Sequence, residues 1–166
     1  MSNSEPANAE AALRRRKFLV VVDKSPEYKK ALRFASRRAE HTGGVVSLVT
    51  VVTPADFQHW RSVEDAMREE AMDEAEKMLY EAAREVGHIA GIIPEVMVLE
   101  GKPRDVLMKL LKDDPDISIL VLASGTGREG PGPLVSLVAQ QSAQAYPIPV
   151  TIVPGALSDE AIDALA

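Results

Sequence analysis

The fold is decided by Ile117-Ser118-Ile119-Leu120-Val121-Leu122-Ala123 and the residues that follow it, Ser124-Gly125-Thr126-Gly127-Arg128-Glu129-Gly130-Pro131-Gly132-Pro133. The apolar run predicts a strand, and the pattern Leu134 to Ala145 predicts a helix. Between them lies a loop with four glycines in eight positions. Because glycine tolerates positive φ and has no Cβ, this loop can bring its backbone N–H groups close to a phosphate. A flexible surface loop is the alternative interpretation.

The same succession of strand and helix recurs along the whole chain. Helical patterns are expected to start near Ser25, Ser62, Pro103 and Leu134, with a short capped helix from Ser158 to Leu165. Strands are expected at Phe18 to Val22, Val45 to Val52, Pro94 to Leu99, Ile117 to Leu122 and Pro149 to Val153. Parallel neighbours need crossover connections, so this order predicts an α/β fold with helices on both faces of a parallel sheet.

Two of the expected helices carry a clear amphipathic stripe. In the first helix Ser25 is the expected N-cap, with Pro26 at the first helical position and Gly43-Gly44 as the stop. Its expected stripe is Tyr28, Ala31, Leu32, Ala35 and Ala39. The second helix should bury Val63, Met67, Ala71, Ala75, Met78, Leu79, Ala82, Val86 and Ile89, with Trp60 capping the core.

Composition excludes several classes of protein. Nineteen basic against 25 acidic residues give a formal charge of −6, which disfavours nucleic acid and anionic lipid as partners. Cysteine is absent, which excludes disulfides, thiolate zinc sites and cysteine nucleophiles and favours a cytoplasmic location. No apolar run approaches the length of a membrane span, and the first dozen residues carry no apolar core of a secretory signal.

The glycine loop fits none of the best-known nucleotide motifs. Gly125-x-Gly127-x-x-Gly130 follows the fourth predicted strand rather than the first, and Pro131-Gly132-Pro133 delays the helix that a dinucleotide fingerprint needs. A P-loop would require Lys-Ser/Thr where Pro131-Gly132 stands. The window around Ser124 is not a Gly-x-Ser-x-Gly nucleophile elbow, and no catalytic pair of nucleophile and base is visible.

Three segments are typical of one family. They are Lys17-Phe18-Leu19-Val20-Val21-Val22-Asp23-x-Ser25, then Ile119-Leu120-Val121-Leu122-Ala123-Ser124-Gly125-x-Gly127, and finally Tyr146-Pro147-Ile148-Pro149-Val150-Thr151-Ile152-Val153. Over about Lys17 to Pro154 the chain therefore resembles the universal stress protein family. The resemblance implies a three-layer α/β/α sandwich of the adenine nucleotide alpha hydrolase-like type, with strand order 3-2-1-4-5. It also implies a homodimer through the last strand, Val150 to Val153.

The family's ATP-binding motif is degraded in this chain. ATP-binding members carry Gly-x-x-Gly, nine residues, and then Gly-Ser/Thr; the three glycines fall here on Ala123, Thr126 and Ser136. Asp23, which the family places near the adenine, is retained, and Lys24 replaces a small residue. The resemblance thus implies a variant subgroup in which a rearranged loop makes any phosphate contacts.

Two functions remain open from the sequence. In the first, the chain is a stress-response module that binds ATP or a related adenine nucleotide, with Mg²⁺ only as a companion of the nucleotide and at most slow ATP hydrolysis. The residues expected at that site are Val22, Asp23, Lys24, Val52, Ser124, Gly125, Thr126, Gly127, Arg128, Gly130 and Ser136. In the second, it binds no nucleotide and acts as a dimeric interaction protein.

The expected organisation of the chain has three parts. A disordered N-terminal tail covers residues 1–16, one domain covers residues 17–155, and a C-terminal tail or short helix covers residues 156–166.

Overall fold

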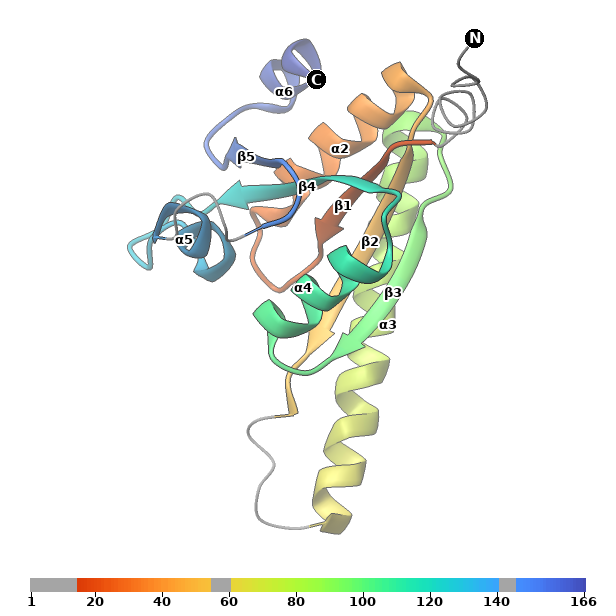
Figure 1. Cartoon of the computed structure of the whole chain (residues 1–166), viewed down its shortest axis with the longest axis vertical. Coiled ribbons are helices and arrows are strands. Elements are labelled where there is room, and N and C mark those ends of the chain that lie inside the picture. Colours follow the sequence, from red (N-terminus) through yellow and green to blue (C-terminus); the bar gives the residue numbers. More distant parts are fainter. Residues whose placement is uncertain (1–14, 55–60, 141–145) are drawn as a thin grey trace, which may run out of the picture.

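A five-stranded parallel sheet forms the centre of the molecule (Figure 1). The computed structural model describes residues 15–54, 61–140 and 146–166, and of residues 61–64 the backbone alone. Its strands are β1 (Lys17–Val21), β2 (Val45–Val52), β3 (Glu95–Glu100), β4 (Ile117–Ser124) and β5 (Val150–Pro154). They lie in the order β3-β2-β1-β4-β5, and every neighbouring pair is parallel. The expected fold class and strand order are confirmed.

Helices cover both faces of the sheet and divide the core in two. On one face lie α2 (Tyr28–Thr42), α3 (Arg61–Ala90) and α6 (Asp159–Leu165), which bury Leu32, Leu79 and Ile162 against Phe18 and Val20. On the other lie α4 (Pro103–Asp113) and α5 (Pro133–Gln140), whose buried side chains pack on Leu19 and Leu120. This is the three-layer sandwich that the alternation of strands and helices predicts.

The first helix begins two residues later than expected. Its N-cap is Glu27, which makes no side-chain cap hydrogen bond, and helical structure starts at Tyr28. Ser25 instead donates from its N–H and its hydroxyl to Asp23 Oδ1, at 2.9 and 2.6 Å. The prediction of Ser25 as N-cap and Pro26 as first helical residue is therefore wrong, because the side chain of Asp23 folds residues 23–25 into a turn of their own. The buried stripe of α2 and the left-handed Gly43 at its end are confirmed.

The second stripe packs only along the later part of α3. Ala75, Leu79, Ala82 and Val86 are buried, whereas residues 65–70 are all exposed and Met67 keeps 43% of its surface. In Figure 1 the first turns of α3 extend past the carboxyl ends of the strands, where no sheet is available to cover them. The expected burial of Met67 is therefore wrong. Trp60, residues 1–14 and the end of the Leu134 to Ala145 pattern lie outside the described residues.

The C-terminal helix α6 closes one side of the core. Ser158 caps it by accepting a hydrogen bond from Ala161 N–H at 3.1 Å, and Ile162 is fully buried. Asp163 receives hydrogen bonds from Arg33 Nε and Nη2 at 2.7 and 2.6 Å, which fix α6 against α2. Among the helices that the structure describes, none combines the length and apolar character needed to cross a bilayer.

The strand order places a crevice at the carboxyl end of β1. The connection that follows β1 runs through α2 to β2 on one side, while β4 pairs with β1 on the other. Helices leave the sheet in opposite directions where the order reverses, and ligands of open α/β sheets bind at that point.

Candidate functional site

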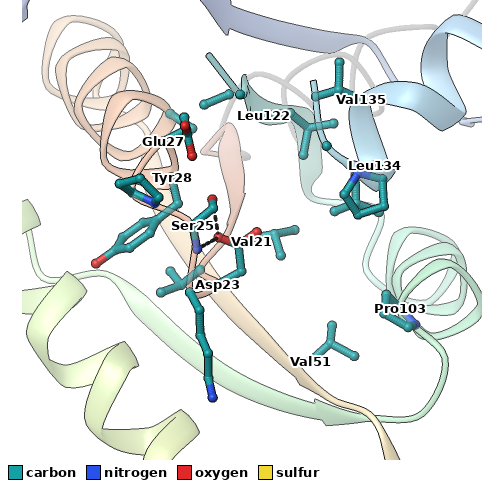
Figure 2. Close-up of a pocket in the computed structure, with 18 of the residues that line it drawn as sticks. Val21, Asp23, Ser25, Glu27, Tyr28, Val51, Pro103, Leu122, Leu134 and Val135 are labelled. Carbon is teal, nitrogen blue, oxygen red and sulfur yellow. Dashed lines mark hydrogen bonds between the residues drawn. The ribbon is translucent and has the colours of Figure 1, made fainter. Parts of the chain in front are cut away.

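A cleft of about 1070 Å³ opens at the carboxyl ends of β1, β2 and β4. Figure 2 shows Glu27 and Tyr28 on one wall, Leu134, Val135 and Pro103 on the opposite one, and Val21 and Asp23 between them. Apolar side chains supply much of the lining, including Val22, Val52, Ala75, Met78 and Leu122. A largely apolar cleft with a few polar groups is typical of small-molecule sites.

Hydrogen bonds hold the end of β1 in place. The N–H of Val22 donates to Val49 O at 2.8 Å, and the buried hydroxyl of Thr50 donates to Val22 O at 2.9 Å. The next residue, Asp23, is exposed and accepts both bonds from Ser25 on the same oxygen, Oδ1. One carboxylate oxygen of Asp23 is therefore engaged within the turn.

The glycine loop closes on itself before α5. The N–H of Gly125 donates to Pro131 O at 3.1 Å, and the N–H of Gly130 donates to Gly127 O at 3.3 Å. A Cβ at Gly125 would lie 2.6 Å from Gly130 O, so this close approach requires glycine. Gly130 and Gly132 have φ values of 87° and 101°, which L side chains rarely adopt. The glycines thus build a fixed backbone turn at the mouth of the cleft.

Charged side chains of both signs surround the mouth. Lys24 Nζ pairs with Glu74 Oε1 at 3.1 Å, which links the β1–α2 turn to α3. The carboxylate of Glu27 lies 3.5 Å from the N–H of Thr126 in the glycine loop. Within the described part of the chain, the guanidinium of Arg128 makes no ion pair.

Tyr28 lies on the cleft wall and its hydroxyl is neutral. Burial raises the pKa of its hydroxyl, and the carboxylates of Glu85, Glu81 and Asp23 raise it further. The phenol therefore keeps its proton at neutral pH.

Eight of the eleven expected site residues line the cleft: Val22, Asp23, Lys24, Val52, Gly125, Gly127, Arg128 and Gly130. Ser124, Thr126 and Ser136 do not. Thr126 lies against the backbone at Gly155 instead, and the N–H of Ser136 donates to Gly132 O at 2.9 Å in the first turn of α5. Glu100, at the end of β3, is bound by Arg68 Nε and Nη2, both at 2.7 Å, and this hydrogen bonding lowers its pKa.

Several lining residues carry no signal in the sequence pattern. Tyr28 and Met78 belong to helices whose stripes predict only core packing. Glu27 and Pro103 stand at helix starts. Only its position along the chain could have indicated Glu27 as a site residue, because Glu27 directly follows the turn after β1.

The family model described as the universal stress protein family matches residues 14–154. The chain belongs to this family. Solved structures of other members show the same fold at low identity. The universal stress protein UspA from Lactobacillus plantarum is 20% identical with a TM-score of 0.70, the match covering 84% of this chain and 98% of that one.

Two further members were solved with a nucleotide. The universal stress protein from Archaeoglobus fulgidus in complex with dAMP is 20% identical with a TM-score of 0.60, covering 85% of this chain and 99% of that one. The family protein from Arabidopsis thaliana with AMP bound is 17% identical with a TM-score of 0.56, covering 87% and 94%. No protein with a curated description matches the chain in sequence.

The cleft of this family member brings several kinds of binding group together. An apolar part, a turn of glycine backbone and one unpaired guanidinium lie together, which suits a flat apolar ring carrying an anionic group. Within residues 15–54, 61–140 and 146–166, no three histidine, aspartate or glutamate side chains are grouped as metal ligands.

Proposed function

We propose that this universal stress protein binds an adenine nucleotide in the cleft at the carboxyl ends of β1, β2 and β4. The observation that carries the proposal is the cleft itself, in which the retained Asp23 and the glycine loop face one space of about 1070 Å³. The members from Archaeoglobus fulgidus and Arabidopsis thaliana, solved with dAMP and AMP, support the choice of an adenine ligand. A regulatory role in a stress response follows from the family.

The parts of the cleft suggest how the nucleotide lies. The adenine ring packs among Val22, Val52 and Met78, where the lining is apolar. The phosphate end lies at the glycine loop, where Gly127 leaves open space and Arg128 supplies a positive charge. Any Mg²⁺ enters only with the nucleotide.

The binding test has two steps. In the first step, freshly purified protein is denatured and the supernatant is examined by mass spectrometry for released adenine nucleotide. In the second step, folded protein freed of any bound nucleotide is titrated with nucleotides by calorimetry. A released nucleotide or a saturable heat supports the proposal. The absence of both a released nucleotide and a saturable heat contradicts the proposal.

We propose no vigorous catalysis at this cleft. Phosphoryl transfer needs a metal-holding carboxylate and a positioned base at the phosphates. The nearest carboxylates of the cleft are Asp23, whose Oδ1 is engaged by Ser25, and Glu129 on the exposed loop.

A second candidate function, a dimeric interaction protein, is favoured by the outer edge of the sheet. β5 is the last strand of the order, and Ile152 keeps 38% of its surface exposed. An open apolar edge strand invites pairing with its copy. A homodimer through Val150 to Val153 is compatible with either function.

A further inference from the structure

The charges around the cleft are unfavourable to a polyphosphate. The charged side chains that line it, among the described residues, are two basic and four acidic: Asp23, Lys24, Glu27, Glu74, Arg128 and Glu129. Lys24 is paired with Glu74, and the pair is exposed, so little free energy is needed to separate it. Releasing Lys24 would leave Glu74 unpaired at the same mouth, however, and the local charge would stay negative.

Part of the loop backbone is already engaged in hydrogen bonds. The N–H groups of Gly125 and Gly130 are already bonded to carbonyls of the loop. The N–H of Thr126 faces the carboxylate of Glu27 at 3.5 Å. A phosphate that used this stretch of backbone would therefore lie within a few ångström of a second negative charge.

The helix that follows adds little to the anion site. Its first residue, Pro133, has no N–H, and the N–H of Ser136 donates to Gly132 O. Only two N–H groups of the first turn remain, and one of them belongs to Val135, whose residue is 8% exposed. The helix N-terminus therefore adds at most two N–H donors to the site.

We infer that the cleft accepts adenine mononucleotides with a single phosphate group and excludes ATP, with Glu27 as the residue that sets this limit. The inference rests on the proposed nucleotide function and names the ligand class of the same site. One guanidinium, that of Arg128, matches one phosphate group. Further phosphates would meet the carboxylates of Glu27 and Glu74 without a compensating cation.

Calorimetric titration of the wild-type protein with adenosine, AMP and ATP tests the order of affinities. The titrations are made once with a chelator and once with Mg²⁺. We expect AMP to bind at least about tenfold more tightly than ATP in both buffers, because two or more extra negative charges enter a negative cleft. An ATP affinity equal to or above that of AMP in either buffer contradicts the inference.

Two variants assign the effect to residues. Glu27→Gln should raise the affinity for ATP about tenfold and leave that for adenosine unchanged, since only the charge near the loop is removed. Arg128→Gln should weaken AMP binding about tenfold and leave adenosine unchanged. The matched control is Glu40→Gln, which removes the same charge from the last turns of α2, outside the cleft, and should change none of the affinities.

The outcomes separate this inference from the function on which it rests. If adenosine, AMP and ATP all fail to bind, both are wrong. If AMP binds and Glu27→Gln leaves the ATP affinity unchanged, nucleotide binding stands and the role of Glu27 is wrong. Glu27 makes no side-chain cap bond, so the variant should fold, and a thermal melt checks this.

Discussion

At the level of single residues, Gly127 in the glycine loop and Gly155 beside it need the absence of a Cβ for different reasons. A Cβ at Gly127 would meet no atom within 4 Å, and its φ is not in the left-handed region. A Cβ at Gly155 would lie 2.3 Å from Ser124 O and 3.1 Å from the side chains of Glu27 and Thr126. Gly127 therefore leaves space for a ligand, whereas Gly155 lets two segments of backbone come together beneath the loop.

Gly127→Ala should weaken the binding of adenine nucleotides without unfolding the domain. The added methyl group occupies the cleft but strains nothing in the protein, so we expect a loss of about tenfold in affinity, or about 1.4 kcal/mol. Calorimetry measures the affinity and a thermal melt the stability. Gly87→Ala, at an unstrained helix position where the nearest atom to a Cβ is 4.0 Å away, is the matched control and should bind normally. An unchanged affinity in Gly127→Ala would show that the loop is not the phosphate site.

Gly155→Ala should destabilise the protein. Its methyl group would overlap the carbonyl of Ser124, and relief requires backbone at the end of β4 or β5 to move. Such overpacking costs about 1 to 3 kcal/mol of unfolding free energy. Denaturant unfolding followed by circular dichroism measures it, with Gly87→Ala as the reference glycine substitution. Stability equal to that of the wild type would mean that this contact relaxes freely.

At the level of elements, the apolar runs were sufficient to predict every strand of the sheet. Each run is mostly apolar, which is the pattern of parallel strands that are buried on both faces. Helix ends were less predictable, because Ser25 could either cap the N-terminus of α2 or hydrogen-bond to a neighbouring side chain. In the structure it donates its hydrogen bonds to Asp23. The exposed start of α3 could not be predicted either, since the stripe through Met67 is the same whether or not a sheet lies beneath it.

The candidate site was predictable where chain position determines it. Asp23, Val52 and the glycines lie at carboxyl ends of strands, and strand order alone brings those ends together. The hydrogen bonds within the loop and the approach of Glu27 to Thr126 arise from tertiary packing. No spacing in the sequence encodes that approach, which joins residues 99 positions apart.

The docking of α6 on α2 should depend on pH through Asp163. Hydrogen bonds from Arg33, and next from Arg37, lower the pKa of its carboxyl from 3.8 to about 2. The folded pKa lies below the unfolded one, so the stabilisation is present above about pH 4 and is lost as the pH falls toward 2. Because Asp163 is partly exposed, its contribution is about 1 kcal/mol rather than the full value of the shift.

Asp163→Asn should therefore lower the free energy of unfolding by about 1 kcal/mol at pH 7, and the difference should shrink steadily as the pH falls from about 4 toward 2. Urea unfolding across this pH range measures both parts. Asp113→Asn, which removes a surface pair with Lys109 at the end of α4, is the control and should have a smaller effect at every pH. A constant difference down to acid pH would mean that the asparagine disturbs packing rather than charge.

At the level of the whole molecule, the sheet has two edges that differ in charge. β3 carries Glu95 and Glu100 at its ends, paired with Lys17 and Arg68, and charged groups on an edge oppose pairing with another chain. β5, with the sequence Val-Thr-Ile-Val-Pro, has no charged side chain. If two copies associate through a sheet edge, we therefore expect them to pair through β5, which carries no charge to oppose the contact.

Sedimentation at micromolar concentration should show a dimer of the wild-type protein, with the β5 strands of the two copies paired. Pro149 and Pro154 lack an N–H and limit that pairing to the residues between them, so one added charge should suffice to break it. Ile152→Lys places that charge on the exposed apolar position of β5 and should give a monomer. Met97→Lys, at a position of β3 that is 40% exposed, is the matched control and should leave the dimer intact. A wild-type monomer contradicts the dimer, and a dimer broken by Met97→Lys alone would move the contact to β3.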